Sequence, residues 1–209
     1  PRRTFGLEAV AGRSIQLSGY KWEEILPGNY DGAAHLADMR ADDIDAAVLF
    51  PTVVLEAYAN PDAPLTLAVM QTYNDWLLED FVAPDAKRLI GLATLPVNHG
   101  MDVAAAELER CVARGAKGFF IPAFPTLSYV EAHYDPLWAA AAAAGTPVCL
   151  HRTFGGVDPM GGFQYSIPGV NVAGTVARFF SGVYPLTYMI YTGVFVRHPE
   201  LRVVDADVN

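Results

Sequence analysis

Short segments of consecutive apolar residues recur along the chain, and each of them stops abruptly. Four of these segments begin near positions 46, 90, 118 and 147 and end at three prolines and one histidine: Pro51, Pro96, Pro122 and His151. A fifth segment runs from Leu201 to Val204. Apolar and polar residues do not alternate in these segments, which is typical of strands covered on both faces. The pattern therefore predicts five buried strands.

Helices are predicted in the intervals between these strands. Five stretches have the apolar spacing or the capping residues of helices, at 33–41, 65–82, 102–114, 135–144 and 173–197. In the last stretch we expect a break at Tyr184 and Pro185. The glycine-rich segment from Thr153 to Val170 has no apolar period and is predicted to be a long loop. Strands that alternate with helices indicate a parallel sheet with right-handed crossovers.

This alternation places the chain in the α/β class, where two architectures compete. A doubly wound nucleotide-binding sheet has a glycine-rich turn after its first strand. Here the strand ends carry prolines, and no G-x-G-x-x-G sequence is present. The pattern therefore favours a (β/α)8 TIM barrel, in which function lies at the C-terminal ends of the strands. A complete barrel has eight strands and about 250 residues, so we expect 1–209 to be a single, partial barrel domain with an irregular segment at 1–30.

The two ends of the chain offer an explanation for the strands that the sequence lacks. The sequence begins at Pro1 without an initiator methionine, and it ends at Asn209, just after a segment that has the character of a buried strand. Compact domains rarely end inside a core strand. We therefore expect the chain to be part of a longer protein.

Composition and charge exclude several classes of protein. The 209 residues are 52% hydrophobic and 18% charged, with a net charge of −9 and no cluster of basic residues, so a nucleic-acid partner is not expected. The longest apolar runs are too short to span a bilayer. Cys111 and Cys149 are interpreted as reduced core thiols, which together with the absence of a signal peptide favours the cytoplasm.

His151 is the strongest candidate for chemistry. It ends the fourth apolar segment, and in a barrel the ends of the strands carry ligands and catalytic groups. Imidazole is the commonest side-chain ligand of zinc and similar metals. The structural alternative is a buried histidine that is hydrogen-bonded to neighbouring backbone. The other histidines lack metal-ligand spacing such as H-x-H or H-E-x-x-H and are interpreted as structural.

Further candidates lie near the same strand ends. Asp207 follows the last strand and either faces the site or is a solvated loop carboxylate. Arg152 is suited to bind a substrate carboxylate, or it neutralises a nearby aspartate. Phe124 and Phe154 are expected either to line a pocket for an aromatic or unsaturated substrate or to serve in packing alone. No G-x-S-x-G sequence supports a serine hydrolase.

Several segments together resemble the amidohydrolase-related (amidohydrolase 2) family. The resemblance begins with the run D-M-R-A-D-D-I-D-A-A-V-L-F-P at 38–51 and continues with Y-N-D-W at 73–76 and R-L-I-G-L-A-T-L-P at 88–96. It extends through G-A-K-G at 115–118, Y-D-P-L-W at 134–138, P-V-C-L-H at 147–151 and G-V-F-V-R-H-P at 193–199. The matches keep their order from about Tyr20 to Val204 and point towards aminocarboxymuconate-semialdehyde and resorcylate-type decarboxylases.

The resemblance implies a metal-dependent barrel enzyme that decarboxylates or hydrolyses a small, often aromatic or unsaturated, carboxylic acid. By that pattern His151 matches the metal ligand on the fifth strand, and Asp207 matches the ligand position on the sixth. The H-x-H or D-x-H pair that the resemblance implies on the first strand and the aspartate on the eighth are absent from these residues, so the catalytic aspartate is expected outside this chain. The implied cofactor is Zn²⁺, or alternatively Mn²⁺. The implied assembly is a homodimer.

Two other classes of function remain open. The chain is alternatively a non-catalytic barrel fragment that serves as an interaction or assembly module, because unpaired sheet edges favour association. A third interpretation is a metal-free lyase or isomerase, although no paired acid and base support it. Metal content and oligomeric state separate the first two possibilities.

Overall fold

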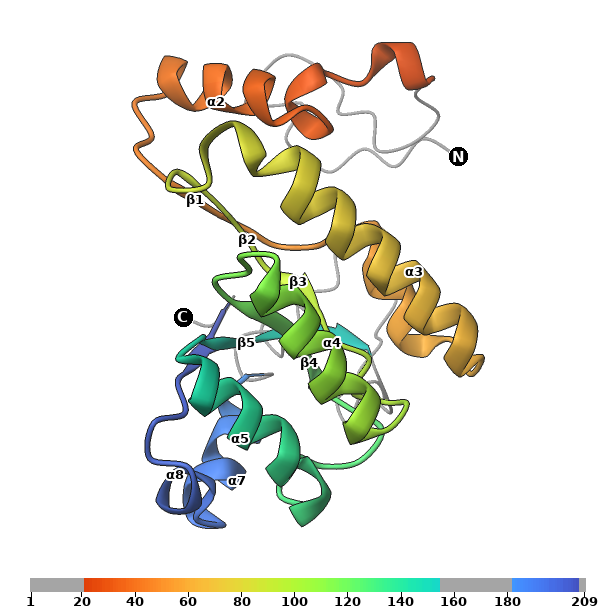
Figure 1. The fold of residues 1–209 in the computed structure, drawn as a ribbon, viewed down its shortest axis with the longest axis vertical. Coiled ribbons are helices and arrows are strands. Elements are labelled where there is room, and N and C mark those ends of the chain that lie inside the picture. Colours follow the sequence, from red (N-terminus) through yellow and green to blue (C-terminus); the bar gives the residue numbers. More distant parts are fainter. Residues whose placement is uncertain (1–20, 155–181, 207–209) are drawn as a thin grey trace, which may run out of the picture.

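The computed structural model describes residues 21–154 and 182–206 (Figure 1). Within them the strands follow one another along the chain as β1 to β6: Ala47–Leu49, Leu89–Gly91, Ala93–Thr94, Phe119–Phe124, Val148–Phe154 and Val203–Asp205. All pairings are parallel, β1 with β2 and then β3 with β4, β4 with β5 and β5 with β6. This order is the one that a (β/α)8 barrel requires.

Strands β2 and β3 belong to one continuous segment. Leu92 separates them, and its N–H donates to Leu49 O at 3.1 Å, which continues the β1–β2 ladder by one residue. Ala93 then pairs with Phe119, so the same segment joins β1 on one side to β4 on the other. The described sheet therefore contains the five strand segments that the sequence predicts, and the predicted α/β barrel class is confirmed.

The α-helices fill the connections between the strands. They are α2, α3, α4, α5, α7 and α8, at Gly32–Ala41, Ala63–Asp75, Met101–Ala113, Asp135–Ala144, Val183–Tyr191 and Val194–Arg197. Two of them begin with an aspartate cap, because Asp31 accepts from Ala34 N at 2.8 Å and Asp62 accepts from Leu65 N at 3.0 Å. Gly145, with φ 63°, ends α5 in the left-handed conformation that glycine adopts most easily.

Shorter helical turns occupy the remaining connections. They are η1 to η6, at Trp22–Glu24, Pro27–Asn29, Val53–Ala59, Trp76–Phe81, Ala83–Asp85 and Ala132–Tyr134. The described part of the segment predicted to be irregular thus contains two short 3₁₀ turns, η1 and η2. The helix predicted at 65–82 begins two residues earlier, at Ala63, and its last part is a π-helix in which Val82 N donates to Leu77 O at 3.0 Å.

One sequence-based expectation about element ends is wrong, and another is only partly described. Of the helical stretch predicted at 173–197, the described part begins with α7 at Val183, next to the predicted break at Tyr184 and Pro185, and Pro185 lies in its first turn, where its missing N–H costs no helical hydrogen bond. A further break, at Gly193, separates α7 from α8 through a φ of 76°. Strand β5 also continues to Phe154, so Thr153 belongs to the strand and not to the predicted loop.

The main core lies between the sheet and the helices that cover it. Figure 1 shows α4 and α5 side by side along the sheet, and their side chains contact each other. Phe119 and Ile121 of β4 are fully buried, as are Leu108 of α4 and Trp138 of α5. Burying an apolar side chain of this size stabilises a fold by roughly 1.5–3 kcal/mol. A second, smaller core joins α2 and η4 to β2 and includes Leu36.

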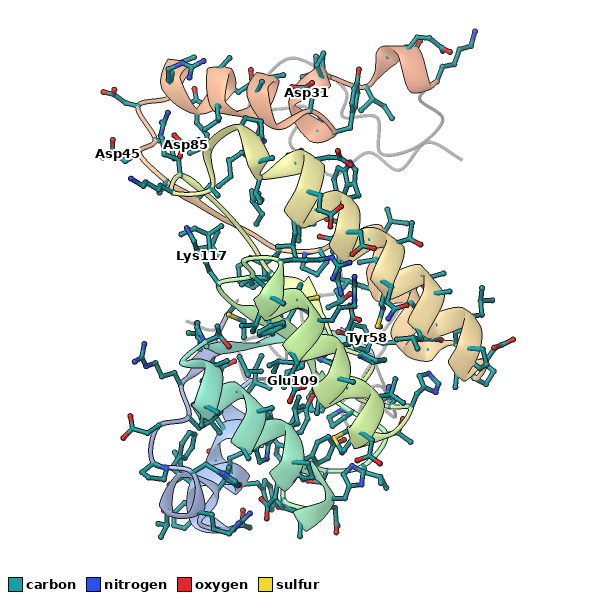
Figure 2. All side chains as sticks on the ribbon, in the orientation of Figure 1. Asp31, Asp45, Tyr58, Asp85, Glu109 and Lys117 are labelled. Carbon is teal, nitrogen blue, oxygen red and sulfur yellow. The ribbon has the colours of Figure 1, made fainter. Side chains whose placement is uncertain are left out.

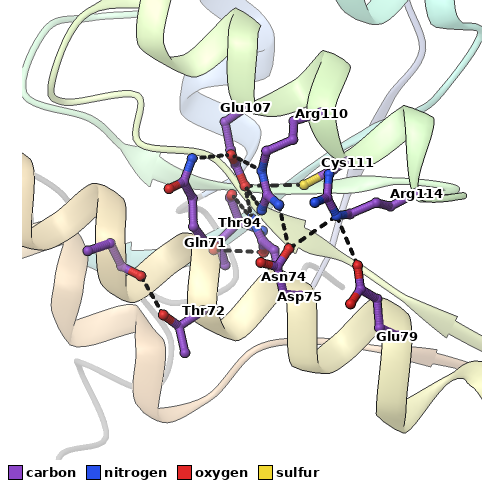
Figure 3. Close-up of polar contacts among 11 residues, drawn as sticks. Gln71, Thr72, Asn74, Asp75, Glu79, Thr94, Glu107, Arg110, Cys111 and Arg114 are labelled. Atoms are coloured by element: carbon purple, nitrogen blue, oxygen red, sulfur yellow. Dashed lines mark hydrogen bonds and ion pairs between the residues drawn. The ribbon is translucent and has the colours of Figure 1, made fainter.

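A buried polar network joins α3 and α4 to β3 (Figure 3). The Asn74 side chain binds the backbone of Thr94 and also donates to Glu107 Oε1 at 2.7 Å. Arg110 donates to both carboxylate oxygens of Glu107, at 2.7 and 2.8 Å, and also pairs with Asp75. Although burial alone would raise the pKa of the Glu107 carboxyl, hydrogen bonds from Arg110, Asn74 and its other neighbours hold that pKa below its usual value.

The described residues agree with two further expectations. Cys111 and Cys149 are both buried free thiols. Among the described helices, none combines the length and the apolar character needed to cross a bilayer.

Candidate functional site

His151 lies towards the end of β5, where the strand leaves the core. The three preceding residues, Val148, Cys149 and Leu150, are buried, whereas His151 is half-buried. It stands in register with Pro122 of β4, so the two strands present these residues at the same level of the sheet. The regular pairing of β5 with β4 ends at this level, but the strand continues for three residues to Phe154, so His151 is not its last residue as the sequence predicts.

Two phenylalanine rings surround the imidazole of His151. The ring centre of Phe50, which directly follows β1, lies 5.4 Å from that of His151, and the ring centre of Phe120 in β4 lies 5.7 Å away. Phe50 and Phe120 also contact each other edge to face, at 6.4 Å. Three residues from three different strand segments thus form one contiguous aromatic group. We refer to His151, Phe50 and Phe120 as the aromatic triangle.

Tyr58 of η3 contacts the aromatic triangle through Phe120. Its hydroxyl donates to Phe120 O at 3.0 Å and accepts from Leu95 N at 3.3 Å, so it joins β4 to the residue that follows β3. The Tyr58 ring also packs on the ring of Phe120, with 5.9 Å between the two ring centres. Burial raises the pKa of the Tyr58 hydroxyl well above its usual range, and the group therefore stays protonated. A second tyrosine, Tyr129, donates to Pro122 O at 2.6 Å.

The other predicted site residues are only partly described. Phe124 is the last residue of β4 and is 7% exposed, and its register partner is Phe154 of β5. Arg152 also belongs to β5, so its backbone lies beside that of His151. The side chains of Arg152 and Phe154, and the whole of Asp207, lie outside the described residues. Their roles therefore stay predictions.

Asp205 is a carboxylate that the sequence analysis did not single out. It ends β6 in register with Leu150, and because side chains alternate along a strand, it lies on the face of the sheet opposite to His151. Its carboxylate lies against Gly182, where a Cβ atom would collide with it. Its Oδ1 atom is buried without a hydrogen-bond partner among the described residues, and burial raises the pKa of Asp205 to about 6. Asp205 and His151 therefore do not form one site.

A metal centre at His151 would need further ligands beside the imidazole. Residues 21–154 and 182–206 contain no group of three or more His, Cys, Asp or Glu side chains that could hold a metal ion. The imidazole itself has the donor chemistry and the strand-end position of a ligand. His151 thus fits the role of one ligand, and a complete metal site requires others from outside the described residues.

His198, His35 and Lys117 have structural contacts. His198 Nε2 lies 3.2 Å from Asp135 Oδ1, and Arg197 binds the same carboxylate at 3.1 Å. His35 Nδ1 lies 2.8 Å from Gly28 O. Lys117 precedes β4 and donates to Ala86 O, and Figure 2 shows it apart from Tyr58. The structural interpretation of these three groups agrees with their contacts.

A shallow apolar groove lies elsewhere on the molecule, between η3 and α3. It has a volume of about 560 Å³ and is lined by side chains that include Val54, Tyr73 and Trp76. It contains none of the predicted site residues. The strand ends around His151, rather than this groove, are therefore the candidate site.

Sequence reasoning missed Phe50 and Tyr58. Phe50 is the last apolar residue before Pro51, but nothing in a single sequence reveals which ring it contacts. The signal for Tyr58 is weaker still, because it lies in a segment predicted to be a loop. A strand-end aromatic residue followed by proline, as in Phe50-Pro51, is the feature that could have drawn attention to the first of them.

Comparison with known proteins places this geometry in a family. The family model described as amidohydrolase matches residues 26–206. A comparison with curated proteins gave no match. Among solved structures, an amidohydrolase from Mycobacterium avium subsp. paratuberculosis K-10 is 26% identical with a TM-score of 0.69, and the match covers 87% of this chain and 49% of that protein.

Two decarboxylases have the same fold at lower identity. The 2,6-dihydroxybenzoate decarboxylase from Rhizobium is 22% identical, with a TM-score of 0.67 over 90% of this chain and 60% of that one. A 5-carboxyvanillate decarboxylase from Novosphingobium aromaticivorans DSM 12444, with bound manganese, is 23% identical, with a TM-score of 0.69 over 97% of this chain and 57% of that one. The chain thus spans about half the length of these proteins. With the family model matched over most of its residues, the chain belongs to the amidohydrolase family.

Proposed function

We propose that the protein acts as a metal-dependent decarboxylase of a small aromatic or unsaturated carboxylic acid. The observation that carries the proposal is the half-buried imidazole of His151 on barrel strand β5, in contact with two aromatic rings. The similar folds of the 2,6-dihydroxybenzoate and 5-carboxyvanillate decarboxylases support decarboxylation. Hydrolysis of a small carboxylic acid is the second candidate, favoured by the description of the matched family as amidohydrolase.

In this proposal His151 is a ligand of a divalent metal. Asp207, which follows β6, is the proposed second ligand. The manganese bound in the similar 5-carboxyvanillate decarboxylase supports a divalent ion, and either Mn²⁺ or Zn²⁺ suits an imidazole and carboxylate ligand set. When bound, such an ion would polarise substrate oxygens as a Lewis acid. The aspartate that moves the proton is expected from a strand beyond β6.

Three residues near His151 are proposed to bind the substrate. Arg152 follows it directly and carries a guanidinium, which suits two-point binding of a carboxylate. Phe124 and Phe154, which are register partners on β4 and β5, are proposed to pack against an aromatic or unsaturated substrate. These assignments rest on position, because only the Phe124 side chain belongs to the described residues.

We also propose that the protein forms a homodimer in the cytoplasm. The two buried free thiols support a reducing compartment. A homodimer is also what the resemblance to the family implies. A non-catalytic assembly module would associate as well, so metal content decides between the two functions.

The decisive experiment measures bound metal per chain after loading with Mn²⁺ or Zn²⁺. We would compare the wild type, His151→Ala and His133→Ala, since His133 is an exposed histidine in η6 that serves as a matched control. We expect the first and third proteins to bind close to one ion and His151→Ala to lose it. Release of CO₂ from dihydroxybenzoates and carboxyvanillates would then test the substrate class.

Two outcomes would contradict the proposal. Equal metal content in the wild type and His151→Ala would remove His151 from the metal site. A wild type that binds no metal and releases no CO₂ from any of these acids would favour the assembly module instead. Oligomeric state, measured by light scattering, would then become the property to follow.

A further inference from the structure

We propose that Phe50 and Phe120 act as an aromatic clamp that fixes the orientation of the His151 imidazole, with Phe50 as a positioning residue of the site. The inference rests on the proposed role of His151 as a metal ligand. It goes beyond that role by assigning a function to Phe50, which directly follows β1 and which the sequence analysis did not name as a site residue.

The geometry of the aromatic triangle is the first argument. The planes of the Phe50 and Phe120 rings are tilted against the imidazole by 39° and 43°. An imidazole that contacts two rings, one after β1 and one in β4, has few side-chain rotamers free of collision. A histidine ligand must point one ring nitrogen at the ion, so restriction of its rotamers favours binding before the ion arrives.

The anchoring of the two phenylalanines is the second argument. Phe120 is fully buried and pairs with Cys149 in the β4–β5 ladder. Its backbone carbonyl accepts a hydrogen bond from the Tyr58 hydroxyl. Phe50 directly precedes Pro51, and a residue before proline is confined to extended backbone conformations. Both rings are therefore held by backbone constraints that do not depend on His151.

The partial exposure of Phe50 is the third argument. Phe120 is at 0% exposure and is part of the main core, whereas Phe50 is half-buried and packs on the edge of that core. Substitution of Phe120 would therefore damage the fold, but substitution of Phe50 can report on the clamp. Phe195 of α8 is also half-buried and packs on the same core, so it provides a matched control.

The test compares Phe50→Leu, Phe50→Tyr and Phe195→Leu with the wild type. Three quantities are measured: the midpoint of thermal unfolding, the dissociation constant for Mn²⁺ alone, and the NMR signals of the His151 ring without metal. We expect both leucine variants to lose similar thermal stability. Only Phe50→Leu should shift the His151 ring signals and weaken Mn²⁺ binding, by about 10-fold or more, as is typical for groups that orient a ligating histidine.

Phe50→Tyr keeps the ring and should restore Mn²⁺ binding close to the wild-type value. Should Phe50→Leu fail to fold, Phe50→Met has a flexible side chain of similar size and takes its place. Mn²⁺ binding that weakens equally in Phe50→Leu and Phe195→Leu would overturn the clamp. If the wild type itself binds no Mn²⁺, the metal proposal fails, and the clamp then stands or falls on whether the His151 ring signals change in Phe50→Leu but not in Phe195→Leu.

Discussion

The side-chain amide of Asn74 pairs with the backbone of Thr94 as a neighbouring strand would. Asn74 Oδ1 accepts from Thr94 N at 2.8 Å, and Asn74 Nδ2 donates to Thr94 O at 3.0 Å. Two residues before Thr94, the backbone N–H of Leu92 still donates to Leu49 O of β1. Asn74 on α3 therefore takes over the ladder of β3 where β1 diverges, and a helix supplies the hydrogen bonds that a strand no longer provides.

Replacement of Asn74 by alanine should be among the costly polar substitutions in this chain. It would leave the buried backbone N–H and C=O of Thr94 without this partner and remove one of the donors to Glu107 Oε1, at a cost of about 2–4 kcal/mol in the free energy of unfolding. Urea denaturation measures the change. Gln71→Ala is the control, because Gln71 donates to Glu107 alone and should cost about 1 kcal/mol. Equal costs for both variants would show that Asn74 does not support the strand.

The buried carboxylate of Glu107 should make stability depend on pH on the acid side. The pKa of Glu107 in the fold lies below its usual 4.5, so the folded state binds fewer protons than the unfolded state as the pH falls. This contribution to stability is present above pH 4.5 and is lost as the pH falls through the lowered pKa of the fold. Denaturation curves collected between pH 3 and 7 measure it.

Glu107→Gln keeps the shape of the side chain and removes the titrating group. At pH 7 this variant should lose about 2–3 kcal/mol, because the hydrogen bonds from Arg110 are no longer made to a charged acceptor. Its stability should also fall less steeply than that of the wild type below pH 4.5. If the variant lost as much stability below pH 4.5 as the wild type, that loss would come from other carboxyl groups, such as Asp135.

Both thiols of the chain should be inert while the protein is folded. Burial raises the pKa of Cys111 to about 12 and that of Cys149 to about 11, so the reactive thiolate is scarce at pH 8. A disulfide reagent such as Ellman's should modify neither thiol at pH 8 without denaturant, and it should modify both in guanidinium. Rapid modification of the native protein would mean that β5 or α4 opens locally.

The strand order could be predicted from the sequence because each barrel strand is covered on both faces and is therefore apolar without interruption. The ends of the elements were harder to predict. Pro185 lies in the first turn of α7, where a proline costs no helical hydrogen bond, so it marks the start of a helix. The break at Gly193, which depends on its positive φ, was not predicted.

The candidate site was predicted only in part, for a physical reason. His151 could be identified because a strand end is a local feature of the sequence. The contacts of His151 with Phe50 and Phe120 depend on how three strands are brought together. The same is true of Asn74 and Glu107, which are buried although polar side chains at helix positions are usually exposed. Such pairings arise from tertiary packing and leave no pattern in a single sequence.

The hydroxyl of Tyr58 should stabilise the strand ends more than that of Tyr129. Tyr58→Phe leaves Leu95 N and Phe120 O without this partner, with an expected loss of about 1–3 kcal/mol, whereas Tyr129→Phe removes a single bond to Pro122 O and should cost about 1 kcal/mol. Because Tyr58→Phe keeps the ring, the packing against Phe120 is retained, and Mn²⁺ affinity should stay close to that of the wild type. Thermal unfolding and Mn²⁺ titration of the two variants measure both quantities. A Tyr58→Phe variant with full stability would show that the strand ends are held without its hydroxyl, and one with full stability but weakened Mn²⁺ binding would place that hydroxyl in the site itself.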